Sequence, residues 1–303
     1  MSSHSYIENS KNQEIYININ GDLLHRSKAK ISVFDSGFLL GDGVWEGIRL
    51  HRSKLLFIEE HLNRLFDSAK GISIDIPLSK KDIIFEIEKV LSKNEMNDDV
   101  HIRLIISRGE KITPYQNPNA NIGPINFVII PEHKKTDPII YKNGITIGRV
   151  KTIRPSDDIL STHYNTLSKL NCILASIEAN ELNYDEGIMN DPFGYISTCN
   201  STNLFFIKNN QVWTSTGEFC LNGITRSKAI SLCQRNGIIC NETNFIFEDI
   251  KDCEEAFVTG TFAGIIPVSK IENRDLDSTK PRSLVNKIRL LYNNHIQEKI
   301  SSK

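Results

Sequence analysis

The stretch VHIRLIISRGEKITPYQNPNANIGPINFVIIP, residues 100–131, decides the fold class of this chain. It begins and ends with apolar runs of strand length, VHIRLIIS (100–107) and INFVIIP (125–131). A long polar loop separates them, and loops of that length in compact domains are usually functional or disordered. Because these strands follow one another without a helix, the chain departs from regular βαβ alternation, and we expect an α+β fold.

Helical periodicity surrounds this stretch. Apolar residues recur at helical spacing in IEEHLNRLFDSAKG (58–71) and again over residues 79–93. A third helix is predicted from about Thr166 to Leu182, a short one from Ile224 to before Gly237, and a closing helix after Pro281. Strands are predicted at 29–33 and 44–50, besides those already named.

The length of 303 residues exceeds what a single core usually reaches, which favours two domains or one large α/β unit. The prolines and charges of PEHKKTDPIIYKNG (131–144) mark a linker at 135–143. We therefore expect a smaller domain over 1–134, with residues 1–14 disordered, and a larger cofactor domain over 144–303.

Charge and hydropathy exclude several classes of partner. Lys and Arg number 36 against 37 Asp and Glu, which gives a net charge of -1 and argues against a nucleic-acid binder. The apolar runs are far too short to cross a membrane, and the first residues lack the apolar core of a secretion signal. We expect a cytoplasmic protein.

The six cysteines all lie in the second half of the chain. None forms a CxxC pair and no histidine stands at ligand spacing, so a zinc site or a disulfide framework is not predicted. Reduced thiols that serve mostly as small apolar residues are the simpler interpretation.

Two segments offer backbone donors to an anion. In LNGITRSKAI (221–230) a glycine precedes a helix start, so the N–H groups of Ile224 and Thr225 and the Thr225 hydroxyl would suit a phosphate. The alternative is an ordinary capped helix. The small residues of VTGTFAG (258–264) form a second cluster of donors, or else a plain tight turn.

Four cations are candidate ligands. Arg64 lies on the helix over 58–71 and can fork onto phosphate oxygens, although most helical arginines only solvate a face. Arg103 and Arg108 stand five residues apart, so on a regular strand they face opposite sides and only one can hold a substrate carboxylate; the spacing does not rank them. Lys169 is either a snorkelling lysine or a desolvated amine of the kind a Schiff base requires.

These pieces, in this order, resemble the class IV (fold type IV) aminotransferases, which depend on pyridoxal 5′-phosphate (PLP). That family includes branched-chain aminotransferases, D-amino-acid aminotransferases and aminodeoxychorismate lyases. The resemblance covers roughly residues 15–272. It is carried by GDGVWEGIRL (41–50), EEHLNRLFDSAK (59–70), DEGIMND (185–191) with GYIS (194–197), STNLFFIK (201–208), NGITR (222–226) and EAFVTGTFAGIIPV (255–268).

The resemblance implies roles for individual residues. Arg64, Ile224, Thr225 and Thr261 match the contacts to the cofactor phosphate, and Trp45 matches an aromatic residue that lines the substrate pocket. Arg103 matches an arginine of the branched-chain type, and Arg108 matches the carboxylate-binding arginine of the D-amino-acid type. The family also implies a homodimer, with each site between the two domains of one subunit and closed partly by the neighbour.

Two positions depart from the family pattern. When ILASIEA (173–179) is aligned without gaps, Asn165 stands at the position of the Schiff-base lysine. Thr198 stands at the position of the glutamate that faces the pyridine nitrogen, followed directly by Cys199 and Asn200, which would supply a different polar environment. On the predicted helix Lys169 lies one turn beyond Asn165, so we interpret it as a relocated Schiff-base lysine.

The resulting functional hypothesis is an atypical PLP-dependent aminotransferase. It would move an amino group between a branched-chain or D-amino acid and a 2-oxo acid. A neutral Thr198 would weaken the electron sink of the ring, because a carboxylate keeps the pyridine nitrogen protonated. Two alternatives remain open, a PLP-dependent lyase or racemase and a homologue that binds another phosphorylated ligand without PLP.

Overall fold

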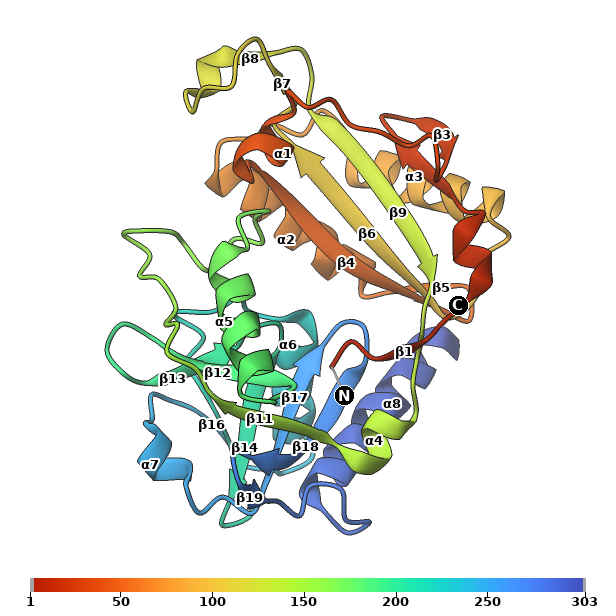
Figure 1. Ribbon diagram of the computed structural model, residues 1–303. Coiled ribbons are helices and arrows are strands. Elements are labelled where there is room, and N and C mark those ends of the chain that lie inside the picture. The colour runs from red at the N-terminus through yellow and green to blue at the C-terminus, as the bar shows by residue number, and fades with distance from the viewer. Residues whose placement is uncertain (1–2, 302–303) are drawn as a thin grey trace. The chain divides into compact units, whose positions relative to one another are not determined.

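The computed structural model describes residues 3–301 and divides the chain into two compact units (Figure 1). The N-terminal unit comprises residues 7–135 and 164–169. The C-terminal unit comprises the described residues up to 6, residues 136–163 and the described residues from 170 onward. The expected fold class, α+β, is confirmed, since both units combine a mixed or antiparallel sheet with helices.

A mostly buried sheet forms the N-terminal unit, with strand order β3-β2-β9-β6-β4-β5. Neighbouring strands of this path are antiparallel. The unit contains η1 (Ser10–Gln13), β2 (Tyr16–Ile19), β3 (Asp22–His25), α1 (Ser36–Leu40), β4 (Gly43–His51), β5 (Lys54–Leu56), α2 (Ile58–Gly71), α3 (Lys80–Lys93), β6 (Val100–Ser107), β7 (Glu110–Lys111), η2 (Pro118–Ala120), β8 (Asn121–Ile122) and β9 (Asn126–His133).

Helices α2 and α3 cover one face of this sheet. Along β6 the alternate residues Ile102, Leu104 and Ile106 are fully buried and join the core formed with Leu62 and Leu65 of α2. The α3 helix begins where Ser79 and Asp82 form a reciprocal capping box, which stabilises the first turn. The opposite sheet face carries the remaining alternate residues, among them Trp45 and Arg103, and these supply candidate site groups.

A nine-stranded sheet forms the C-terminal unit, with strand order β13-β12-β11-β18-β17-β14-β15-β16 and β19 paired with β18. Along the sequence, the boundaries between the units fall within β1 (Tyr6–Ile7), within β10 (Lys135–Thr136) and on either side of residues 164–169. The C-terminal unit contains α4 (Ile139–Asn143), β11 (Ile145–Arg149), α5 (Leu170–Glu181), β12 (Glu186–Asn190), β13 (Ile196–Cys199), β14 (Asn203–Lys208), β15 (Gln211–Thr214), α6 (Ile224–Arg235), β16 (Cys240–Glu242), α7 (Phe247–Ile250), β17 (Glu255–Gly260), β18 (Gly264–Ile271), β19 (Arg274–Asp275) and α8 (Leu284–Ser301).

Several segments differ from the expectations. The segment 135–143 contains β10 and α4, with Ile140 fully buried in the C-terminal core, so it is a packed element rather than an open connection. Residues 3–14 carry β1 and η1 instead of disorder, and residues 1–2 lie outside the described chain. The strand predicted at 29–33 does not form, and β2 is followed instead by β3 at Asp22–His25.

The predicted helix over 166–182 begins only at Leu170, which is a correction. The preceding residues run beside β4 instead: Thr166 forms a β-bridge with Val44, and the Leu167 N–H donates to the Gly43 carbonyl over 2.9 Å. Asn165 and Lys169 are therefore not one helical turn apart. Among residues 3–301, no helix is both long and apolar enough to span a membrane.

Candidate functional site

The N-terminus of α6 presents backbone donors that the protein does not satisfy by a cap. Gly223 is the N-cap residue in extended conformation, and no side chain in the described part of the chain caps the helix. The N–H groups of Ile224 and Thr225 stand in the first turn, where a helix offers no acceptor. A Cβ on Gly223 would lie 2.2 Å from the Asn203 Oδ1 atom, so glycine lets the backbone approach that side chain. The positive end of the helix dipole favours an anion here.

The Thr261 turn lies at the same end of the C-terminal sheet. Asn203, which touches Gly223, pairs across the sheet with Thr259 on β17, and that strand ends at Gly260 directly before Thr261. The Thr259 Oγ1 atom is buried without a hydrogen-bond partner among the described residues. The structure thus brings the α6 N-terminus and the Thr261 turn to one edge, and unsatisfied donors there fit the phosphate of PLP.

Thr198 and Cys199 end strand β13 and face different surroundings. The Thr198 hydroxyl donates to the Thr202 carbonyl over 2.8 Å, which leaves only its oxygen lone pairs for another partner. The Cys199 side chain lies in the hydrophobic core and is 3% exposed. Burial raises the pKa of the Cys199 thiol well above its usual value. Cys199 is therefore a neutral, apolar side chain at this position.

The N-terminal unit holds Arg64 in a buried charge network that we call the Glu46 cluster, made of Glu46, His61 and Arg64. Arg64 Nε donates to Glu46 Oε1 over 2.7 Å and Arg64 Nη2 to Oε2 over 2.8 Å, while His61 Nδ1 lies 2.7 Å from Oε2. The Glu46 side chain is fully buried. Burial opposes its ionisation, but the hydrogen bonds from Arg64 and His61 outweigh burial and lower the pKa of Glu46.

Sequence reasoning missed Glu46, although a signal was present. Glu46 occupies a core-facing position between Val44 and Ile48 in the alternation of β4, where a lone carboxylate would be costly. A buried acid at such a position requires a cationic partner, and α2 supplies Arg64.

Trp45, Arg103 and Lys169 come together on the sheet face opposite α2 and α3. The Arg103 guanidinium lies 3.8 Å from the centroid of the Trp45 ring, and the Lys169 Nζ atom lies 5.6 Å from it. Both distances are within the range of cation–π attraction. Desolvation lowers the pKa of Arg103, opposed by the carboxylates of Glu132 and Glu46. A guanidinium remains charged under these conditions, so this cluster can attract a carboxylate.

Asn165 is fixed between β4 and α2. Its side-chain amide donates to the Trp45 carbonyl over 2.7 Å, and its backbone N–H donates to Ser68 Oγ over 3.0 Å. Its backbone carbonyl accepts from the Trp45 N–H over 3.0 Å. Asn165 therefore fixes the Trp45 backbone beside the extended segment that leads to Lys169, and the next residue of that segment, Thr166, accepts from the Trp45 indole Nε1 through its carbonyl over 3.1 Å. Its Oδ1 atom is buried without a partner among the described residues.

Arg108 is engaged by the protein itself. Its Nε and Nη2 atoms donate to the two Asp42 carboxylate oxygens over 2.7 and 3.0 Å. Its Nη1 and Nη2 atoms also donate to the carbonyls of Ser73 and Ile72, at the end of α2, over 2.8 and 2.7 Å. The guanidinium thus connects the end of β6 to α2, whereas Arg103 lies over an aromatic ring with the other candidates.

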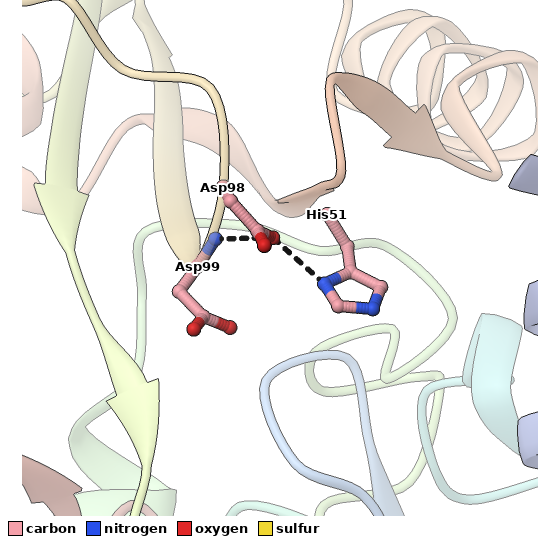
Figure 2. Close-up of side chains that lie close together, drawn as sticks. All are labelled: His51, Asp98 and Asp99. Atoms are coloured by element: carbon pink, nitrogen blue, oxygen red, sulfur yellow. Dashed lines mark hydrogen bonds and ion pairs between the residues drawn. The ribbon is translucent and has the colours of Figure 1, made fainter.

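One further cluster combines His51, Asp98 and Asp99 (Figure 2). Asp98 Oδ1 lies 2.8 Å from His51 Nδ1 and accepts from the backbone N–H groups of Arg52 and Asp99, each over 2.8 Å. Asp99 is compensated by Arg49 at 3.8 Å and Lys135 at 3.7 Å. These pairs fix the β4–β5 turn against the start of β6, so we assign the cluster a structural role.

The two-unit α+β fold and the sequence motifs of the chain agree with a match to a known protein family. The family model of class IV amino-transferases matches residues 43–271, which is most of the chain. The chain belongs to the class IV aminotransferase family.

Two relatives are similar to the chain in sequence, and one solved structure shares its fold. It is 36% identical over 274 residues to the branched-chain-amino-acid aminotransferase-like protein 1 of Arabidopsis thaliana, covering 89% of this chain and 48% of the relative. It is 34% identical over 274 residues to a putative branched-chain-amino-acid aminotransferase of Methanocaldococcus jannaschii, covering 90% and 93%. The chain thus spans about half the length of the first relative and nearly all of the second.

The structural relative is an aminotransferase from Brucella abortus bound to the cofactor PLP. It superposes with a TM-score of 0.82 at 23% identity, covering 93% of this chain and 99% of that one. This likeness establishes the shared fold.

Proposed function

We propose that this chain is a PLP-dependent aminotransferase that moves an amino group between an amino acid of the branched-chain or D-amino-acid type and a 2-oxo acid. The observation that carries the proposal is the α6 N-terminus. Within the described residues, its N–H groups at Ile224 and Thr225 have no side-chain cap, and they lie at the same sheet edge as the Thr261 turn. Both segments fall within the part of the chain that the class IV family model matches. Arg64 is proposed as a further contact to the cofactor phosphate because it stands at that position of the class IV pattern, and Glu46 accepts from its Nε and Nη2 atoms.

When bound, PLP supplies an aldehyde that takes up the amino group and a ring that withdraws electrons from the substrate. Thr198 is proposed to face the pyridine nitrogen. Because its hydroxyl proton is already donated to Thr202, it can accept a hydrogen bond there but carries no negative charge to keep that nitrogen protonated. This is the atypical part of the proposed site.

Lys169 is proposed as the amine that would hold the cofactor at its aldehyde and as the general base and acid that would move the substrate α-proton. Two observations support this residue over Asn165. The Asn165 amide is committed to the Trp45 carbonyl, and an amide is not a nucleophile. Lys169 extends toward Trp45, beside the arginine proposed to hold the substrate.

Arg103 is proposed to hold the substrate carboxylate, and Trp45 to form a wall of the side-chain pocket. Arg108 was the other candidate, but its guanidinium donates to Asp42 and to two carbonyls. Arg103 therefore fits the role better, because no carboxylate of the described residues forms a two-pronged hydrogen-bonded pair with it as Asp42 does with Arg108.

A homodimer is part of the proposal, supported by the exposed face of α5. Leu170, Ile173, Leu174 and Ile177 are 67%, 52%, 47% and 48% exposed at spacings of three, four and seven residues from the first. Four large apolar side chains in one stripe support the proposal that another chain covers this surface. A second copy of this chain is the proposed occupant.

Absorbance during PLP titration tests the function. We expect a visible band in the wild type that amino acids bleach and 2-oxo acids restore, and no band in Lys169→Ala, with exposed Lys54→Ala as the control. A band that amino acids alter without a restorable half-reaction would favour a lyase or racemase, the alternative supported by the neutral Thr198. Absence of any band would favour the binder of another phosphorylated ligand.

A further inference from the structure

Residues 3–6 are anchored to the C-terminal unit at three points. Ser3 is buried, and its hydroxyl donates to the Glu186 carboxylate on β12. The Ser5 carbonyl accepts from the Asp137 N–H over 3.3 Å. The His4 ring is offset-stacked on Phe262, with centroids 6.2 Å apart and planes 9° from parallel. The sequence pattern had suggested disorder here, so these contacts require an explanation.

Glu186 is a buried carboxylate whose described hydrogen-bond donors are neutral. It is 1% exposed. Besides Ser3, it accepts from the Ser201 N–H over 3.1 Å, from the Ser201 hydroxyl and from the Thr202 hydroxyl over 3.2 Å. Desolvation raises the pKa of Glu186, and the hydrogen bonds from Ser201 and Ser3 oppose that rise. A buried acceptor of this kind depends on each of its donors.

The residues that surround Glu186 also orient Thr198. Ser201 and Thr202 belong to the turn between β13 and β14. The carbonyl of Thr202 accepts from the Thr198 hydroxyl over 2.8 Å and from the Cys199 N–H over 3.0 Å. Any movement of Thr202 relative to β12 therefore moves the acceptor that fixes the Thr198 hydroxyl.

The same terminal segment contacts a second turn. Phe262, on which His4 stacks, directly follows Thr261. Phe262 is 4% exposed and belongs to the hydrophobic core of the C-terminal unit. Residues 3–6 thus contact, from one short stretch of chain, the turn that orients Thr198 and the turn that carries Thr261.

We propose that residues 3–6 form a strap in which Ser3 is a positioning residue. The strap holds the Ser201–Thr202 turn, which orients Thr198, and the turn that carries Thr261 in the arrangement that binds PLP. Ser3 acts through Glu186 and the Ser201–Thr202 turn, and His4 acts through Phe262. The identity of the ligand rests on the proposed function, whereas the mechanical role of the strap does not.

The test compares Ser3→Ala in the full chain with Ser301→Ala, which removes an exposed hydroxyl from the end of α8. Without PLP, we expect amide hydrogen exchange at Ser201 to be about tenfold faster in Ser3→Ala, because its acceptor loses one of four donors. We also expect a PLP Kd about five- to tenfold weaker by fluorescence titration. Glu186→Gln, which keeps the volume but replaces an acceptor oxygen, should change both measurements in the same direction.

The two measurements separate the possible failures. Unchanged exchange at Ser201 in Ser3→Ala would overturn the strap. Faster exchange with an unchanged PLP Kd would overturn the positioning role. If the wild type binds no PLP, the proposed function fails, and the exchange measurement still decides whether the strap holds the turn.

Discussion

The N-terminus of α6 and the Glu46 cluster treat charge in opposite ways. Helix α6 begins with glycine at the N-cap, and within residues 3–301 its first N–H groups have no side-chain cap and the buried Thr259 hydroxyl has no partner. In the Glu46 cluster, the carboxylate receives two hydrogen bonds from Arg64 and faces the His61 ring. The donors at the α6 N-terminus can therefore stabilise a bound anion, whereas the cations of the Glu46 cluster stabilise a carboxylate of the protein itself.

Removing the carboxylate of the Glu46 cluster should produce the largest change in the free energy of unfolding. Glu46→Gln leaves Arg64 without its anion beside a buried amide, and we expect the free energy of unfolding to fall by about 3 kcal/mol in urea titrations. Because the pKa of Glu46 is lowered in the folded state, its contribution is present above the usual value of 4.5 and is lost as the pH falls. The difference between wild type and variant should therefore shrink in acid; a difference independent of pH would contradict the assignment.

The two arginines of the β6 region extend the same comparison to the substrate. Arg103→Met should raise the KM for the amino acid by about 10- to 100-fold, since a charge-assisted hydrogen bond to the carboxylate is lost. Arg108→Met should instead lower stability by about 2 kcal/mol, because it removes the bonds to Asp42 and to the end of α2. Steady-state kinetics and urea unfolding of both variants check this, and the reverse assignment of effects would reject our ranking.

A substitution at the α6 N-terminus should change the affinity for phosphate ligands rather than the free energy of unfolding. Thr225→Val keeps the volume of the side chain but removes its hydroxyl, and we expect PLP and inorganic phosphate to bind about fivefold more weakly, with unfolding nearly unchanged. Thr225→Ser retains the hydroxyl and serves as the matched control. Equal phosphate affinity in the Val and Ser variants would show that the hydroxyl contributes nothing to the site.

Local patterns predicted much of this fold. The strand over 100–107 and the helix over 79–93 follow from an apolar run and from apolar residues at helical spacing, both of which are short-range signals. The α6 start was visible because glycine before an isoleucine–threonine pair is also a local feature. The class IV motifs then assigned the fold and the candidate residues.

What the pattern could not supply depends on contacts between distant segments. The late start of α5 results from pairing of residues 165–167 with β4, more than a hundred residues earlier, which overrides their helical spacing. The preference for Arg103 required the partners of Arg108 to be seen. Likewise, the burial of Ser3 against Glu186 joins segments that no periodicity connects.

The proposed function depends most directly on Lys169, the residue proposed to bond covalently to PLP. We propose to reduce the PLP-loaded wild type with borohydride, digest it and locate the pyridoxyl group by mass spectrometry. If Lys169 is the residue that bonds to PLP, we expect one labelled peptide, modified at Lys169. A label on another lysine, or retention of PLP without any reducible bond, would contradict it.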